Sequence, residues 1–577
     1  MSTFYIPNSQ GRVQQVNHGD LFGELWGSFN IDLIYSPGKV KSSKALTPVL
    51  TSVQLGTTKR IQSICLFGGY YYIATQTKVF RCLVGTNPTV TANWTELATF
   101  ATENLTVYSD ASVFNGLILF SLGTDIASYN GTTKISSWWV GTVGGTALTN
   151  NVPHIMEVQR TGIDTLFVTD GNKIRYYNST AGHSLITLDN TMTACAIATG
   201  VDATWVGTFT STESQAFVYE IFVGETTAGG TPVAHQAYPI DGRAVLAMCT
   251  VDNIPYIVTD KGHIQAFNGA GFVTIGSFPF AHSSVSLSGV AAGLVQNPND
   301  ARGIHPKAMK VNNGIIHVFT NTALEYTPTD GRKTGDERSA SGIWTFDPAT
   351  KSLNHMSAIT MNANQRGHHY LSNSGPLYIV DDQYTRFMCG AQTSASENGL
   401  FVDGTYGESY IITPEITATS VTEAWEKVYL KTTSLSASNL VSVKYRTTES
   451  LAYPLNGTVT WLNANTFTSI DTAFLSIIAG NEVELLNGTF AGRMCNVLSV
   501  VVSGATITVT VDTTFGVLND TCFARVQNWA ILETKTSGDT HMIGINQTAG
   551  WVQFKVVMSG QVELRQFISK GNADKSL

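Results

Sequence analysis

A strand–turn–strand phrase recurs along much of this chain. NGLILFSLGTDIASYNG begins at Asn115, and related phrases begin at Ile163 (IDTLFVTDGNKIRYYN) and Ile254 (IPYIVTDKGHIQAFNG). The last aromatic or apolar residues of successive phrases are 44 to 49 residues apart at Phe80, Tyr129, Tyr177, Ile221 and Phe267, and later phrases end at Phe346 and Phe387. A period of about 40 to 50 residues with two or more strands per unit is typical of propeller blades.

Each unit is a small meander that cannot bury both of its faces alone, whereas a ring of units buries them and leaves few exposed strand edges. We therefore predict a β-propeller of about seven blades over residues 51–405. Six or eight blades remain open, because the outer strands are poorly marked. The alternative is a long β-sandwich with regularly spaced hairpins. The sequence has neither a WD dipeptide nor the S-x-D-x-G-x-T-W box of sialidases. Gly68-Gly69 resembles a kelch double glycine, but it does not recur at the blade period.

The two ends differ from this pattern. Residues 1–50 are irregular but rich in aromatic residues, which predicts an N-terminal arm that packs on a neighbour or closes the ring. Residues 406–577 contain alternating segments such as AWEKVYLKTTS, in which Val428, Leu430 and Thr432 face one way and Tyr429 and Lys431 the other. They predict a C-terminal β-sandwich. Short strands and glycine turns at about 469–533 predict a small SH3-like barrel inserted into it, so the expected fold is all-β.

Composition narrows the functional classes. Of 577 residues only 13% are charged, about half of the usual ~25%, and the net charge of −8 without a basic run argues against broad nucleic-acid binding. No apolar run has the ~18 residues that a membrane span needs, and MSTFYIPNSQ does not resemble a secretory signal. The seven scattered cysteines predict small core residues in a reducing compartment.

No motif predicts catalysis, a cofactor or a metal. The nucleophile elbow, the phosphate-binding loop and the H-E-x-x-H zinc motif are absent. His368 and His369 are adjacent, so on a strand they would point to opposite faces. Asp381-Asp382 follows an apolar run and is typical of a turn, as are Asp170-Gly171 and Asp260-Lys261-Gly262. Trp138-Trp139 can stack on a sugar, but we favour a core role.

One segment differs from the low-charge body. TPTDGRKTGDERSAS, residues 327–341, lies between two predicted strands of one long hairpin and carries the charged residues Asp330, Arg332, Lys333, Asp336, Glu337 and Arg338. A charged hairpin tip is a candidate loop for docking a partner of matched charge. A solvated loop without a partner is an equal alternative.

The order of a degenerate propeller and a C-terminal sandwich with the rhythm EAWEKVYLKTTSLSASNLVSVKYRTTE … WVQFKVVMSGQVELRQFISKG resembles tail proteins of tailed bacteriophages, of the nozzle type, over about residues 50–577. The resemblance implies a non-enzymatic virion protein of the tail, assembled in the bacterial cytoplasm. It implies a ring of copies, six in number, around the DNA exit channel. Its other partners would be adaptor, fibre or spike proteins, and DNA would pass without specific binding.

Two other classes remain. A glycan-binding or glycan-degrading propeller protein of a phage tail or cell surface would need a carboxylate pair or an aromatic platform at the mouth of the ring. An intracellular interaction scaffold would usually show a better-preserved repeat and a more highly charged surface.

Overall fold

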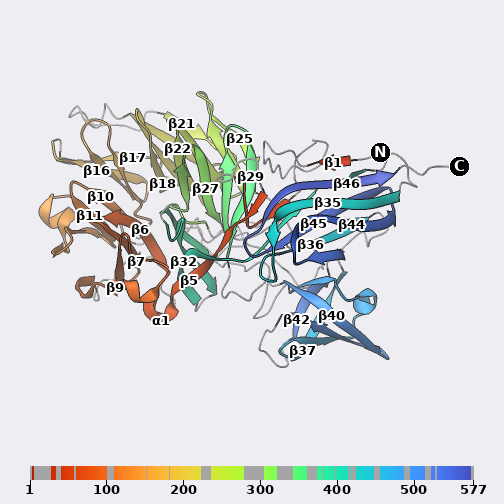
Figure 1. Cartoon of the computed structure of the whole chain (residues 1–577). Helices are drawn as coiled ribbons and strands as arrows, with labels where there is room; N and C mark the ends of the chain where they lie inside the picture. Colours follow the sequence, from red (N-terminus) through yellow and green to blue (C-terminus); the bar gives the residue numbers. More distant parts are fainter. Residues whose placement is uncertain are drawn as a thin grey trace.

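The computed structural model describes most of the chain (Figure 1). The described residues are 3–5, 27–33, 40–56, 60–100, 110–150, 152–180, 182–222, 236–278, 304–320, 342–359, 373–380, 383–394, 397–413, 416–417, 424–447, 455–485, 494–513, 521–526 and 529–572. Among them, strands predominate and helical turns are short: α1 (Ser52–Leu55), η1 (Thr91–Asn93), η2 (Ala98–Phe100), η3 (Trp138–Thr142) and η4 (Thr472–Ser476). None of these has the length that crossing a bilayer requires.

The described residues form seven four-stranded antiparallel sheets, which are the blades of a β-propeller. Blade 1 holds β6 (Ile61–Phe67), β7 (Tyr70–Thr75), β8 (Val79–Leu83) and β9 (Trp94–Glu96); blade 2 holds β10 (Ala111–Phe114), β11 (Leu117–Leu122), β12 (Asp125–Tyr129) and β13 (Lys134–Ile135); blade 3 holds β14 (Met156–Gln159), β15 (Thr165–Asp170), β16 (Lys173–Asn178) and β17 (Gly182–Thr187); blade 4 holds β18 (Thr193–Thr199), β19 (Ala203–Phe209), β20 (Phe217–Phe222) and β21 (Gln236–Pro239).

Three further blades complete the ring: blade 5 holds β22 (Val245–Val251), β23 (Ile254–Thr259), β24 (His263–Phe267) and β25 (Phe272–Ser277); blade 6 holds β26 (Met309–Asn312), β27 (Ile315–Thr320), β28 (Gly342–Asp347) and β29 (Ser352–Ala358); blade 7 holds β30 (Asn373–Ile379), β31 (Phe387–Ser394), β32 (Glu397–Tyr406) and β5 (Lys44–Thr51). The first strand of each blade is innermost and contacts the first strands of its two neighbours, so β30 also meets β6. The predicted propeller of seven blades is confirmed.

Hairpin chemistry explains the recurring phrase. Asn115-Gly116 and Asn313-Gly314 both take positive φ at two successive residues, as the type I′ turn between two strands requires. Gly68-Gly69 forms the same turn in blade 1. Six of the phrase-ending residues lie in the third strand of a blade. The last, Phe387, instead begins the second strand of blade 7, because GPLYIV forms the inner strand there.

The N-terminal arm closes the ring. β5 pairs with β32 from Lys44 to Thr51 and supplies the fourth strand of blade 7. The expected boundary at residue 50 therefore falls inside a propeller strand. Leu50 and Leu55 are buried in an apolar cluster that joins blade 7 to blade 1. Joining the two ends of the chain in one sheet removes the free edge that an open ring would leave.

The C-terminal part is a β-sandwich that also takes in arm strands (Figure 1). One sheet holds β1 (Thr3–Tyr5), β3 (Ile31–Asp32), β4 (Val40–Ser42), β46 (Glu563–Asn572), β35 (Ala424–Leu435) and β44 (Gly538–Thr548); the other holds β2 (Gly27–Phe29), β33 (Glu408–Ile412), β34 (Ile416–Thr417), β45 (Trp551–Ser559), β36 (Leu440–Thr447) and β43 (Ala530–Lys535). Val428, Leu430 and Thr432 are buried, Tyr429 is partly buried and Lys431 is exposed, which agrees with the predicted alternation of faces.

The inserted domain is a closed six-stranded barrel of β37 (Leu455–Asn463), β38 (Thr466–Ser469), β41 (Thr506–Val511), β40 (Met494–Ser503), β39 (Glu482–Leu485) and β42 (Thr521–Val526). It differs from the expected range of 469–533 at both ends. GTVTWLNAN belongs to the barrel because β37 pairs with β42, and β43 belongs to the sandwich because it pairs with β36. In Figure 1 the barrel lies below the sandwich, away from the propeller.

Candidate functional site at the propeller channel

A group of buried and partly buried charged side chains lies where the inner strands of the propeller begin. Asp110 directly precedes β10 in blade 2, and Glu157 is the second residue of β14 in blade 3. Lys307 comes from the loop before β26 in blade 6. In a ring of seven, blade 6 is three positions from blade 2 and from blade 3, so the lysine side chain reaches across the central channel.

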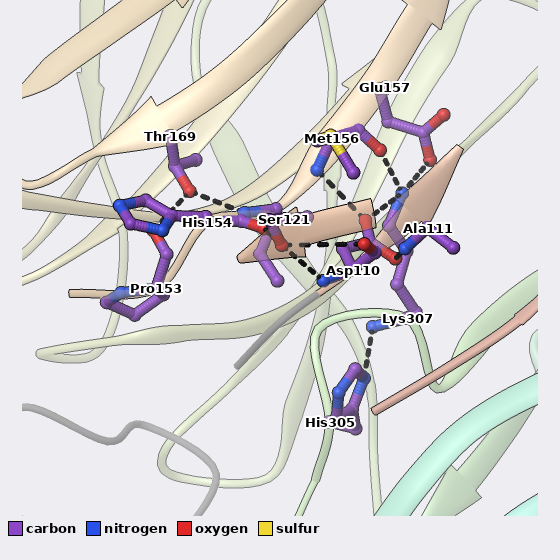
Figure 2. Close-up of polar contacts among 11 residues, drawn as sticks. Asp110, Ala111, Ser121, Pro153, His154, Met156, Glu157, Thr169, His305 and Lys307 are labelled. Carbon is purple, nitrogen blue, oxygen red and sulfur yellow. Dashed lines mark hydrogen bonds and ion pairs between the residues drawn. The ribbon is translucent and has the colours of Figure 1, made fainter. Parts of the chain in front are cut away.

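Lys307 joins these blades through three contacts (Figure 2). Its ammonium donates to the carbonyl oxygen of Met156 at 2.7 Å and to the Oε1 atom of Glu157. It also lies 3.3 Å from the Oδ2 atom of Asp110. A lysine held by two carboxylates and a carbonyl has its three protons directed at acceptors, which is the condition for keeping a buried charge.

Asp110 is tied into the same network by its backbone and its side chain. Its Oδ2 accepts from the amide of Met156 at 2.9 Å, and its Oδ1 accepts from the amide of Ala111 at 2.8 Å. The hydroxyl of Ser121 accepts from the Asp110 amide at 2.7 Å and reaches the His154 carbonyl at 3.3 Å. Burial raises the pKa of Asp110 despite the nearby lysine, whereas Lys307 holds the pKa of Glu157 below its usual value although burial opposes this.

The loop that carries Lys307 is fixed by blade 7. The amide of His305 donates to the Ser374 hydroxyl at 3.2 Å, and the amide of Leu377 donates to the Lys307 carbonyl at 3.0 Å. The Nδ1 atom of His305 accepts from the Lys307 amide at 3.1 Å. Burial, helped by Lys307, Arg60 and Lys310, lowers the pKa of His305 to about 3, so its ring is neutral at pH 7.

The tautomer of His305 follows from that hydrogen bond. Because Nδ1 is the acceptor, the single proton of the neutral ring sits on Nε2. His305 is only 4% exposed, and its Nε2 has no partner among the described residues. The site therefore holds one buried donor without an acceptor from the described protein.

Lys310, three residues further along in β26, lacks the ion pairs that Lys307 makes. It has no hydrogen bond or ion pair within the described ranges. Burial and the charge of Lys307 lower its pKa. Cys65 and Cys249 lie near enough to interact electrostatically with Lys310, and burial raises the pKa of both thiols, so neither is a reactive thiolate.

This arrangement ties blades 2, 3 and 6 together across the ring. Each charge of Lys307, Asp110 and Glu157 faces an opposite charge, and the two nearby thiols stay protonated. Across the part of the chain that the structure describes, no three or more His, Cys, Asp or Glu side chains are grouped to hold a metal ion.

A second buried ion network joins the barrel to the sandwich. Glu482 at the start of β39 accepts from Lys444 of β36 at 2.6 Å and from Lys555 of β45 at 2.8 Å. All three residues are at most 4% exposed. Although burial opposes it, the two lysines lower the pKa of Glu482 to about 2. Asn496 of β40 also accepts from Lys444. The barrel is thus held on the sandwich by paired charges.

The sequence-predicted docking residues cannot be compared with these sites. Asp330, Arg332, Lys333, Asp336, Glu337 and Arg338 lie outside the described residues, as do His368, His369, Asp381 and Asp382. Trp138 and Trp139 are buried between blades 2 and 3, so the prediction of a core role is confirmed. All seven cysteines are buried thiols outside any disulfide, and the prediction that they are core residues is confirmed.

One expected turn residue does more than form a turn. Asp170 is buried and lies 2.8 Å from Arg175 and 3.7 Å from His154. Its Oδ1 also accepts from the Thr149 amide. Sequence reasoning missed this role and the whole Lys307 network. The available signal was position, because Asp110, Glu157 and Lys307 each fall within two residues of the start of an inner strand in a chain with few charges.

Comparisons with known proteins give no family for this chain and only weak structural likeness. No family model and no curated protein matches the sequence. Among solved structures, virginiamycin B lyase from Staphylococcus aureus is similar at 10% identity and a TM-score of 0.38, over 60% of this chain and 96% of that one. The WD40 β-propeller domain of Doa1 is similar at 9% identity and a TM-score of 0.36, over 62% and 97%. Likeness at this level carries no argument.

Proposed function

We propose that this chain is a structural component of a bacteriophage tail that assembles as a ring of copies and docks other tail proteins. The observation that carries the proposal is the barrel. It is fixed on the sandwich by buried charges, yet its outer surface is unusually apolar. Its exposed apolar residues, here called the barrel apolar surface, are Leu462, Ile470, Leu475, Ile478, Leu498, Val501 and Val502.

Single exposed apolar residues are ordinary, but seven on one small barrel favour a surface that a partner covers. Ile470 is 78% exposed and Val501 is 61% exposed. The proposal assigns this surface to a neighbouring copy of the same chain. Interface cores are depleted of charge, which suits a protein with only 13% charged residues.

The contacts of Lys307 with Asp110 and Glu157 in the propeller channel also support the proposed function. Lys307 crosses the propeller channel and is held on the far side by Glu157 and Asp110. A channel filled by braced side chains is a poor conduit for DNA. In the proposed assembly, DNA passes along the axis of the ring of copies, and the propeller of each copy serves as a rigid wall.

Charge substitutions on the barrel test this proposal. The variant Leu498→Lys/Val501→Lys should lose self-association, because two ammonium groups cannot be buried at an apolar contact. The matched control is Val53→Lys/Val201→Lys, which changes two exposed valines of the propeller. Sedimentation velocity of the three proteins gives the result. Loss of assembly in the barrel variant alone supports the proposal, and equal assembly in all three contradicts it.

The same samples address the glycan-binding alternative. A wild-type protein that stays monomeric and binds or cleaves a bacterial surface glycan in a parallel array would replace the structural proposal. The two barrel lysines should leave such binding unchanged if it used the propeller.

A further inference from the structure

The buried junction between the barrel and the sandwich brings a lysine, a side-chain amide and a carboxylate together. The Nζ atom of Lys444 donates to the Oε1 atom of Glu482 at 2.6 Å and to the Oδ1 atom of Asn496 at 3.0 Å. Lys444 belongs to the sandwich, whereas Glu482 and Asn496 face each other on the paired barrel strands β39 and β40. An amine nitrogen, an amide carbonyl and a proton acceptor thus meet at one point.

The side-chain amide of Asn496 is held so that its oxygen faces the lysine. Its Nδ2 atom donates to the Oδ2 atom of Asp512 at 2.8 Å, and its backbone amide donates to Oδ1 of the same carboxylate at 2.8 Å. The carbonyl carbon of Asn496 therefore lies one bond from the oxygen that Lys444 contacts. Lys444 is only 4% exposed, but the contact of Nδ2 with Asp512 is exposed, so a group released from Nδ2 can leave to solvent.

The charges of the junction favour a change at Lys444. Glu482 also accepts from Lys555 at 2.8 Å, so one carboxylate is shared by two lysines. All three side chains are almost fully buried, and burying a charge is costly. Converting Lys444 into an uncharged amide would remove one buried charge and leave Glu482 paired with Lys555 alone.

The contacts of Lys307 in the propeller channel lack this combination. In the described part of the chain, its ammonium meets two carboxylates and a backbone carbonyl, without a side-chain amide. Although burial opposes it, Asp110 and Glu157 raise the pKa of Lys307. Lys307 therefore stays an ammonium, which has no lone pair for attack.

We propose that Lys444 and Asn496 form an isopeptide bond that joins the sandwich covalently to the barrel. Glu482 takes one proton from the Lys444 ammonium, and the neutral amine attacks the Cγ atom of Asn496. The Nζ–Cγ bond forms and the Cγ–Nδ2 bond breaks. One of the two protons left on Nζ moves to Nδ2, which departs as ammonia and takes up the proton held by Glu482. The step needs no oxidant or cofactor and releases one ammonium ion.

The bond would close a large loop of the chain. Lys444 and Asn496 are 52 positions apart, and a covalent link between them restricts the unfolded chain more than the folded one. The cross-link would therefore hold the barrel on the sandwich more firmly than the ion pairs alone.

Mass spectrometry of the full chain tests the proposal. Wild type should be lighter than its sequence by one ammonia molecule, and a tryptic digest should contain a branched peptide that joins Lys444 to Asn496. Lys444→Arg keeps a cation beside Glu482 but lacks the amine, and Glu482→Gln removes the proton acceptor, so both should keep the full sequence mass. Lys535→Arg, the same change at the lysine that pairs with Glu533 on β43, is the matched control and should retain the branched peptide.

Two results would overturn the proposal. One is a wild-type mass equal to the sequence mass, both in fresh protein and after prolonged incubation. The other is an ammonia loss that persists in Lys444→Arg, because Asn-Gly pairs such as Asn115-Gly116 can lose ammonia by forming a succinimide. Circular dichroism checks that the variants fold, and the wild-type mass is informative without them. The outcome is independent of the proposed tail function, since the bond lies within one chain.

Discussion

Lys307 of blade 6 makes an ion pair with Glu157 of blade 3, and the two residues lie 150 positions apart in the sequence. The contact crosses the channel of the propeller and ties together blades that share no strand edge. Its neighbour Lys310 points to no described acceptor. Comparing Lys307 with Lys310 therefore shows how much the ion pairs of a buried lysine contribute to stability in one environment.

We predict opposite outcomes for the same substitution at these two positions. Lys307→Met should destabilise the propeller by about 3 kcal/mol, because it removes the ion pairs that Lys307 makes with Asp110 and Glu157. Lys310→Met should be neutral or stabilising, because burial and the charge of Lys307, which lower the pKa of Lys310, outweigh its attraction to Glu157 and Asp110. Urea unfolding of both variants measures the difference. Equal destabilisation by the two substitutions would contradict the claim that the ion pairs of Lys307 stabilise the propeller.

Glu482 should control the attachment of the barrel. Glu482→Gln leaves Lys444 and Lys555 buried without a counter-charge, a loss of about 3 kcal/mol in the local stability of the junction. Hydrogen exchange of the β36, β39 and β45 amides should rise accordingly. Glu533→Gln, at an exposed pair with Lys535, makes the same chemical change and should leave this exchange unchanged. Protected amides in Glu482→Gln would refute the assignment.

Acid should weaken the same junction in a defined range. The pKa of Glu482 is about 2 in the folded chain, below its ordinary value of 4.5. The stability that this group contributes is therefore fully present above about pH 4.5 and is lost as the pH falls toward about 2. Exchange at β39 measured from pH 5 to pH 2.5 should increase in wild type beyond the intrinsic change. A profile identical to that of Glu482→Gln would contradict the linkage.

His305 should make the stability of the propeller depend on pH, beginning at a higher pH than for Glu482. Its pKa of about 3 lies below the ordinary value of 6.5, so between these values the unfolded chain binds a proton that the folded chain does not. Stability should fall as the pH drops from about 6.5 toward about 3. His305→Asn keeps an acceptor near Nδ1 but does not titrate, so its stability should change less over this range. Parallel Tm profiles for the two proteins would exclude His305 as the cause.

The side chain of Asn30 should stabilise the junction between the propeller and the sandwich through its hydrogen bonds. Its φ is 55°, and its side chain accepts from the Ala358 amide at 3.0 Å and donates to the Ser43 carbonyl at 2.9 Å. Asn30→Gly keeps the backbone conformation but loses these bonds, whereas Asn30→Ala also adds a left-handed strain of about 1 kcal/mol. The alanine variant should therefore have the lower Tm. Equal values would show that backbone strain plays no part.

Much of the fold was predictable because its signals are local. Asn115-Gly116 and Asn313-Gly314 mark the inner hairpins, since few residue pairs accept two positive φ values. The domain limits were harder to predict. GTVTWLNAN alternates as a sandwich strand does, and only its pairing with β42 places it in the barrel. The closing role of β5 depends on a partner about 350 residues away.

The charged sites were not predictable in the same way. Nothing near Lys307 in the sequence identifies Asp110 or Glu157 as its partners, because only the closed ring brings blades 2, 3 and 6 to one axis. Glu482, Lys444 and Lys555 likewise meet only once the barrel is docked. Buried pairs of this kind are a property of the tertiary structure, and a single sequence holds the residues without their pairing.

The most direct test of the proposed function is the mass of the purified wild-type chain. Light scattering at several concentrations, with electron microscopy of the same sample, should give rings of about six copies of the 62.1 kDa chain. A protein that stays monomeric at every concentration, alone and when mixed with candidate phage tail proteins, would contradict the account.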